Sequence, residues 1–218
     1  MGGLVKHLVS ILCLLGLAPA VLAALLDRGN GLLFDDQLNV TWTRSANLPA
    51  AAGGDGRMTW DAAQSWVAQL EWGGFSDWRL PSARLREGFS ECSAFDGSCD
   101  QGYQVVNSEL GHLFYSTLGN RGFYDINGAQ RSSGFGLVNR TYRGDGISIA
   151  FDDLQAWPYW FGEEGSSMDE KSGLLDAAWI FGFISGQQFQ FSKETPAFVW
   201  AVRDGDVAPV PLPGGLGL

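Results

Sequence analysis

Apolar residues recur at helical spacing in the first third of the chain. The repeat follows positions i, i+3, i+4 and i+7, which places four apolar side chains on one face of a helix. These side chains are Ala63, Trp66, Val67 and Leu70. Thr59 is a suitable N-cap before this run, and two glycines follow it at positions 73 and 74. The pattern predicts an amphipathic helix over residues 59–72.

A second helical spacing lies in the middle of the chain, over residues 108–118. Its apolar positions are Leu110, Leu113, Phe114 and Leu118. Ser108 can cap its start, and Gly119 stands where such a helix would end. We therefore expect a second, short helix.

Short runs of β-branched and aromatic residues, separated by turns, make up much of the remaining chain. They lie at residues 32–34, 38–42, 157–162, 177–192 and 197–207. The first two runs flank a polar turn at residues 35–37, which is typical of a β-hairpin. In the last run Phe198, Trp200 and Val202 share one face. One or two helices with many short strands and long loops predict an α+β fold with an antiparallel sheet.

The sequence Trp78-Arg79-Leu80-Pro81 sets an arginine between two large apolar residues. Successive side chains of an extended segment point to opposite faces, so Trp78 and Leu80 would be buried and Arg79 would point away. We expect a structural role for these four residues, in which Arg79 pairs with a carboxylate and holds loops in place. The candidate partners are Asp77, Asp204 and Asp206. Ligand binding by Arg79 is the alternative.

The first 23 residues have the pattern of an export signal. Lys6 makes the start positive, residues 8–17 are apolar, and small residues up to Ala23 suit a cleavage site. Cleavage would change the net charge from −10 to −11. No later run approaches the roughly 20 apolar residues of a membrane-spanning helix. We expect an exported protein with one domain over residues 24–207.

The acidity of the chain bears on its partners. A strongly negative protein repels nucleic acid, so neutral glycans, cations or another protein are better candidates. Cys92 and Cys99 would remain after cleavage, because Cys13 lies in the signal. An even number of cysteines in an oxidising compartment favours one disulfide.

Signals for catalysis are weak. His112 is the only histidine after residue 23, and it lies among apolar helix positions where a structural role is more common. Patterns for a nucleophile elbow, a P-loop, a zinc site or dinucleotide binding do not occur. We predict neither an enzyme nor a required cofactor. Acidic loops leave calcium binding open, although without EF-hand spacing, and leave glycan hydrolysis as a further alternative.

Aromatic residues near position 160 are the strongest sign of a ligand. Rings pack on the apolar faces of sugars, while carboxylates accept hydrogen bonds from hydroxyls. Trp157 and Tyr159 flank Pro158, which favours a loop or an edge strand and therefore exposed rings. We predict a glycan-binding surface made of Trp157, Tyr159, Trp160, Asp152 and Asp153.

Blocks spread over residues 29–207 resemble the Lcl C-terminal domain family, the domain of unknown function 1566. They are GLLFDDQLNVTW, TWDAAQSWVAQL, GGFSDWRLPSA, CSAFDGSCDQGY, NSELGHLFYSTLGN, YWFGEE, AWIFGF and FVWAVRDGDV. The family is named for a collagen-like bacterial adhesin, so the resemblance implies adhesion or carbohydrate binding at a bacterial surface or matrix. A more distant similarity, to the formylglycine-generating and C-type-lectin-like superfamily, implies a C-type-lectin-like fold.

The Pro/Gly tail over residues 208–218 is similar to the start of a PEP-CTERM sorting signal through Val210-Pro211-Leu212-Pro213. In that subgroup an apolar span and basic residues follow, whereas here the remaining residues are GGLGL. We therefore expect release into the medium or periplasm rather than surface anchoring. The predicted function is a secreted, non-enzymatic recognition module for a glycan or extracellular polysaccharide. A matrix protein without a small ligand is the alternative.

Overall fold

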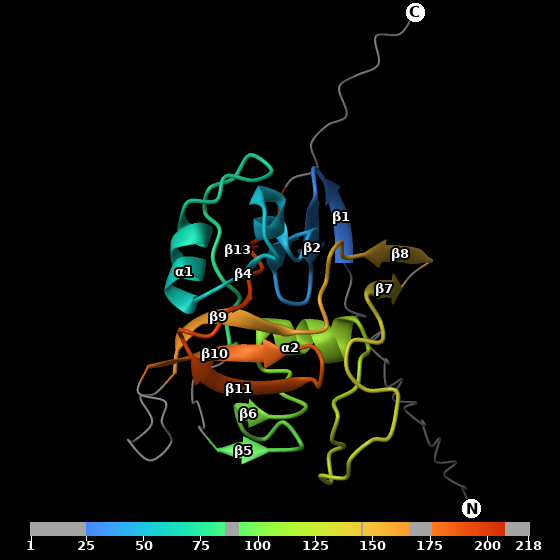
Figure 1. The fold of residues 1–218 in the computed structure, drawn as a ribbon. Helices are drawn as coiled ribbons and strands as arrows, with labels where there is room; N and C mark the ends of the chain where they lie inside the picture. The colour runs from blue at the N-terminus through green and yellow to red at the C-terminus, as the bar shows by residue number, and fades with distance from the viewer. Residues whose placement is uncertain (1–24, 86–91, 145, 166–175, 208–218) are drawn as a thin grey trace, which may run out of the picture.

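The computed structural model describes residues 25–85, 92–144, 146–165 and 176–207 (Figure 1). The predicted export signal and the predicted sorting tail lie outside these ranges. Within them the chain has an α+β architecture with mostly antiparallel strands and short helices. The coarse fold class predicted from the sequence is therefore confirmed.

A four-stranded antiparallel sheet joins the two ends of the described chain. Its strands, in spatial order, are β1 (Leu25–Gly29), β2 (Leu32–Asp35), β3 (Val40–Thr43) and β13 (Val202–Asp204). β2 and β3 form the predicted hairpin, in which Leu33 pairs with Trp42. On its other edge β3 pairs with β13, so that Trp42 also faces Val202. β3 therefore depends on β13, from the other end of the described chain, for its second partner.

The largest sheet, the central sheet, has seven strands and extends from the middle of the molecule to its lower edge in Figure 1. Its order is β4 (Arg57–Met58), β12 (Ala197–Phe198), β9 (Pro158–Glu164), β10 (Ala177–Gly182), β11 (Gln187–Ser192), β6 (Gln101–Gly102) and β5 (Ser93–Ala94). The pairs β12–β9 and β5–β6 are parallel, and the others are antiparallel. A separate hairpin consists of β7 (Thr141–Gly144) and β8 (Ile147–Ala150).

Both predicted helices form, each with a modified end. α1 (Trp60–Ala68) ends earlier than predicted. After it, the N–H groups of Gln69 and Leu70 donate to carbonyls three residues back, and the chain then turns through two glycines with positive φ. α2 (Glu109–His112) continues as a π-helical turn, η2 (Leu113–Thr117), and its predicted cap is confirmed: Ser108 Oγ accepts the N–H of Gly111 at 3.1 Å. A short 3₁₀ helix, η1 (Leu48–Ala52), precedes β4.

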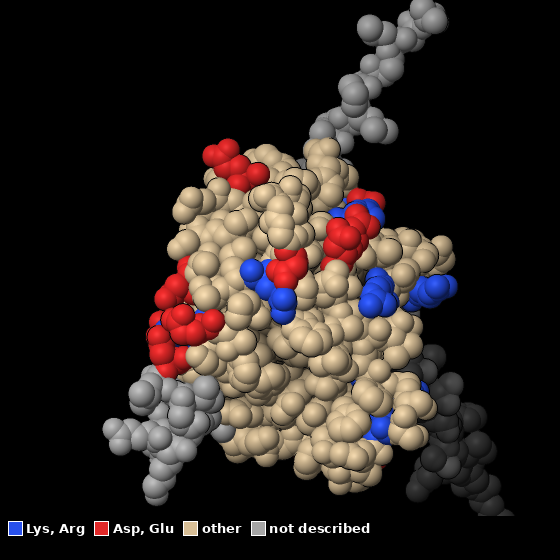
Figure 2. Space-filling view, viewed as in Figure 1, with Lys and Arg blue, Asp and Glu red and all other residues tan. Residues whose placement is uncertain are grey.

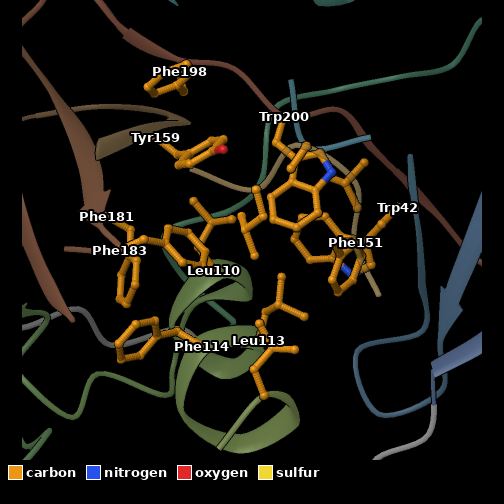
Figure 3. Close-up of a cluster of buried hydrophobic side chains, with 14 of the residues drawn as sticks. Trp42, Leu110, Leu113, Phe114, Phe151, Tyr159, Phe181, Phe183, Phe198 and Trp200 are labelled. Atoms are coloured by element: carbon orange, nitrogen blue, oxygen red, sulfur yellow. The ribbon is translucent and has the colours of Figure 1, made fainter. Parts of the chain in front are cut away.

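Side chains of the central sheet alternate between two buried apolar clusters. Tyr159 and Phe161 of β9 belong to one cluster, and Trp160 belongs to the other. Figure 3 shows the first cluster, in which residues of α2 and η2 pack against rings from β9 and β10 and against Trp42 and Trp200. The second cluster lies under α1. β10 is buried at every position, and its residues are accordingly all apolar or glycine.

The disulfide predicted from the cysteine count is present between Cys92 and Cys99. It closes a loop over residues 92–99. β5 lies inside this loop, directly after Cys92, and β6 follows shortly after Cys99. Phe95, inside the loop, packs against Tyr103 and Tyr124 with ring centroids 6.0 and 5.0 Å apart. The loop is therefore held by one covalent bond and a small group of aromatic rings.

Candidate ligand-binding surface

Arg79 joins three parts of the fold. Trp78 and Leu80 are buried as predicted, and the Arg79 backbone exchanges hydrogen bonds of 2.8 and 2.9 Å with Val202 of β13. Its guanidinium donates two hydrogen bonds, of 2.9 and 2.8 Å, to the carboxylate of Glu109 at the start of α2. It also bonds Asp204 of β13. The structural role predicted for Arg79 is supported by these contacts.

The partners of Arg79 differ in part from those predicted. Asp204 was expected and is confirmed, whereas Asp77 pairs with Arg203 and Asp206 pairs with Arg28. No sequence pattern pointed to Glu109, because an acid in the first turn of a helix is already explained by the helix dipole. Burial acts to lower the pKa of Arg79, but hydrogen bonds to Glu109 and Asp204 outweigh it and raise that pKa.

A hollow of about 580 Å³ lies beside this ion pair. The carboxylates of Glu109 and Glu163, which line this hollow, accept hydrogen bonds from neighbouring protein groups. Glu109 also accepts the N–H of Ser82 at 2.7 Å, and Glu163 accepts the Ser82 hydroxyl at 2.6 Å and the N–H of Ala83 at 2.9 Å. This network fixes the chain after Pro81, so we assign it a structural role.

Trp157 is the most exposed of the nine tryptophans, with 47% of its surface accessible. It lies directly before β9, where its carbonyl accepts the N–H of Phe183 at 3.2 Å. On one side of Trp157 is a polar hollow of about 410 Å³. Its lining residues are Asp55, Arg57, Arg140, Gln155, Ala156, Trp157 and Phe198.

The polar hollow presents charged and amide groups next to the exposed ring. Arg57 donates to Asp55 Oδ2 through Nε at 2.8 Å and Nη2 at 2.6 Å, and this hydrogen bonding lowers the pKa of Asp55. Arg140 is exposed and is anchored by its Nε, which donates to the carbonyl of Leu154 at 3.2 Å. The hollow therefore combines an apolar ring with groups that can bind hydroxyls.

The expectation that Tyr159 is exposed is wrong, and Trp160 is buried as well. Pro158 is the first residue of β9, a position that tolerates proline within an interior strand, so it did not signal an edge. Tyr159 lies in the core against Phe183 and Trp200, and burial raises its pKa (Figure 3). Its hydroxyl accepts the N–H of Gln155 at 2.9 Å, so Tyr159 positions the wall of the hollow from inside.

Asp152 and Asp153 are exposed, but neither is among the residues that line the hollow beside Trp157. The backbone of Asp152 pairs with the segment at Arg44 and Ala46. Asp153 has a positive φ of 56°, and its carbonyl accepts the side-chain amide of Gln155 at 2.8 Å. Of the five predicted ligand-binding residues, only Trp157 thus lines this surface. Arg57 and Arg140 were missed because they are distant in the sequence.

His112 and the acidic side chains of the described residues bear on the catalytic and calcium alternatives. His112 is half-buried, burial lowers its pKa, and its Nε2 has no hydrogen-bond partner within the described part of the chain. No three His, Cys, Asp or Glu side chains among the described residues gather as metal ligands would. The calcium alternative therefore has no candidate ligand set in these ranges. No helix there has the length and apolar character needed to cross a membrane.

Comparisons with models of protein families, with curated proteins and with solved structures find no match to this chain. The resemblance to the Lcl C-terminal domain family therefore stays a prediction from the sequence blocks.

Proposed function

We propose that this protein is an exported, non-enzymatic recognition module that binds a glycan through the surface around Trp157. The observation that carries the proposal is the exposure of the Trp157 ring beside a polar hollow. The exposed ring offers a flat apolar face at the rim of a cavity, where a ligand can stack on it. Sugars suit such a place because they present apolar faces to rings and hydroxyls to polar groups.

The fold and family assignments belong to the same proposal. The α+β architecture with mostly antiparallel strands is compatible with a C-type-lectin-like domain of the Lcl C-terminal type. The ordered sequence blocks support that family, and its adhesin name supports carbohydrate binding outside the cell.

A glycan array tests the proposal. Wild-type protein is expected to bind a subset of saccharides, and Trp157→Ala is expected to weaken that binding by at least about ten-fold. The reason is that burial of an aromatic side chain contributes about 1.5–3 kcal/mol. Binding is measured by titration calorimetry with the best array saccharide.

Trp72→Ala is the matched control, because Trp72 is 37% exposed and belongs to a different surface. It is expected to bind like wild type. An array without any bound saccharide would favour the matrix protein without a small ligand, and turnover of a bound saccharide would favour a hydrolase. Unchanged binding by Trp157→Ala would remove Trp157 from the site.

A further inference from the structure

An apolar groove of about 360 Å³ adjoins the proposed glycan surface. This is within the range of roughly 300–1,000 Å³ that small-molecule sites occupy. Its lining residues are Arg57, Trp157, Pro158, Ile180, Ile184, Phe189, Phe191, Thr195, Pro196 and Ala197. In the view of Figure 2 the surface over β10 and β11 is largely uncharged.

The groove exists because α1 covers only part of one sheet face. α1 is fastened over β9, where Trp60 Nε1 donates to the carbonyl of Phe161 at 2.8 Å and Gln64 Nε2 donates to that of Gly162 at 2.9 Å. Farther along the same face, Phe189 of β11 lies opposite Ile180 of β10. These side chains form the floor of the groove.

Large apolar side chains remain exposed around this floor. Ile184 is 50% exposed in the turn after β10, and Phe191 near the end of β11 is 39% exposed. With Trp157 they make three exposed apolar groups along one cavity. Such a gathering is a sign of binding rather than of ordinary surface composition.

The groove and the polar hollow are adjacent. Trp157 and Arg57 line both of them. The groove can contact the apolar part of a ligand, and the hollow can bind its hydroxyls or charges. The ring of Trp157 lies between the two. A ligand that fills both must itself be amphipathic.

We propose that the natural ligand is a saccharide with an alkyl or acyl substituent, whose sugar lies on Trp157 and whose apolar chain occupies the groove. The inference rests on the proposed glycan function and adds the class of glycan to it. Each methylene group buried in the groove contributes about 0.8 kcal/mol, which is about four-fold in affinity.

The test measures binding of methyl, butyl, hexyl and octyl β-glucoside to the full chain, below the concentrations at which micelles form. Affinity is expected to rise with chain length, by at least about ten-fold from methyl to octyl. Ile184→Ser is expected to flatten this dependence. Ile126→Ser is the matched control, because Ile126 is 63% exposed and does not line the groove, and it should keep the wild-type dependence.

Equal affinity for methyl and octyl β-glucoside, or no binding of either, would overturn the groove assignment. The glycan array tests binding of saccharides that carry no alkyl chain. If the groove assignment fails and the array still shows binding, the proposed glycan function is retained. A change of sedimentation coefficient in Ile184→Ser would show that a second copy of the chain occupies the groove, and this outcome also overturns the inference.

Discussion

Asp35 is a fully buried carboxylate at the turn between β2 and β3. Its Oδ1 accepts the N–H groups of Gln37 and Leu38, each at 3.1 Å, while its Oδ2 has no hydrogen-bond partner among the described residues. Burial raises the pKa of Asp35 from 3.8 to about 6, and the nearby charges of Asp36 and Glu109 act in the same direction. The buried charge therefore opposes folding at neutral pH.

The sign of the pH dependence follows from this raised pKa. Between pH 4 and 6 the folded protein binds more protons at Asp35 than the unfolded chain does, so this residue makes stability fall as pH rises. Asp35→Asn removes the charge and keeps an acceptor for the turn. We expect it to be about 2–3 kcal/mol more stable than wild type at pH 7 and nearly equal to it at pH 4.

Urea unfolding at several pH values measures this difference. Glu194→Gln is the control, since Glu194 is exposed and is not among the groups that shift the pKa of Asp35, and it should follow the wild-type curve. A constant difference between Asp35→Asn and wild type from pH 4 to 7 would show that Asp35 is not the titrating group.

Alternation along the chain predicts the burial of some single residues but not of others. The burial of Trp78 and Leu80 follows from alternation within a short extended segment, and the structure confirms it. Alternation could not decide between Trp157 and Tyr159. Trp157 lies just outside β9 and Tyr159 lies just inside it, so only the position of the strand start separates an exposed ring from a buried one.

At the scale of elements, the Arg79 ion pairs connect the segment before Pro81 with α2 and β13. The two acids that bind Arg79 differ sharply in exposure, with 3% for the Glu109 side chain and 81% for that of Asp204. Glu109→Gln is expected to lower the free energy of unfolding by about 2–4 kcal/mol, because it leaves a charged hydrogen-bond network without its central anion. Asp204→Asn should lower it by less than about 1 kcal/mol, as for exposed ion pairs.

Urea unfolding followed by tryptophan fluorescence compares these two variants. Similar losses from both would contradict the assignment of Glu109 as the principal partner of Arg79. The sequence predicted an acidic partner but not this one, because the pairing of Glu109 with Arg79 depends on where α2 packs in the fold.

At the scale of the whole molecule, the first and last parts of the described chain form one sheet. β13 is the neighbour of β3, and Thr41 Oγ1 donates to the carbonyl of Gly205 at 2.7 Å. Arg203, within β13, pairs with Asp77 and lies 4.2 Å from the ring centroid of Phe75. The terminal strand therefore closes the fold around the Trp78 segment.

A chain that ends at Ala201 is expected to lose cooperative unfolding, because the contacts of β13 supply a large part of the roughly 5–15 kcal/mol that stabilises a domain. A chain that ends at Val207 keeps all the contacts described above and should unfold like the full chain. Thermal unfolding by near-ultraviolet circular dichroism makes the comparison. A sharp transition in the Ala201 chain would show that the sheet closes without β13.

The sequence by itself determined the local features of this protein. Helical spacing predicted α1 and α2, the polar turn predicted the hairpin of β2 and β3, and the pair Cys92 and Cys99 predicted one disulfide. These features depend on residues that are close together in the sequence. Only the tertiary structure decided which rings are buried, which acid binds Arg79, and that Arg57 and Arg140 meet Trp157. Those outcomes depend on how elements that are distant in the sequence pack together, which no local periodicity contains.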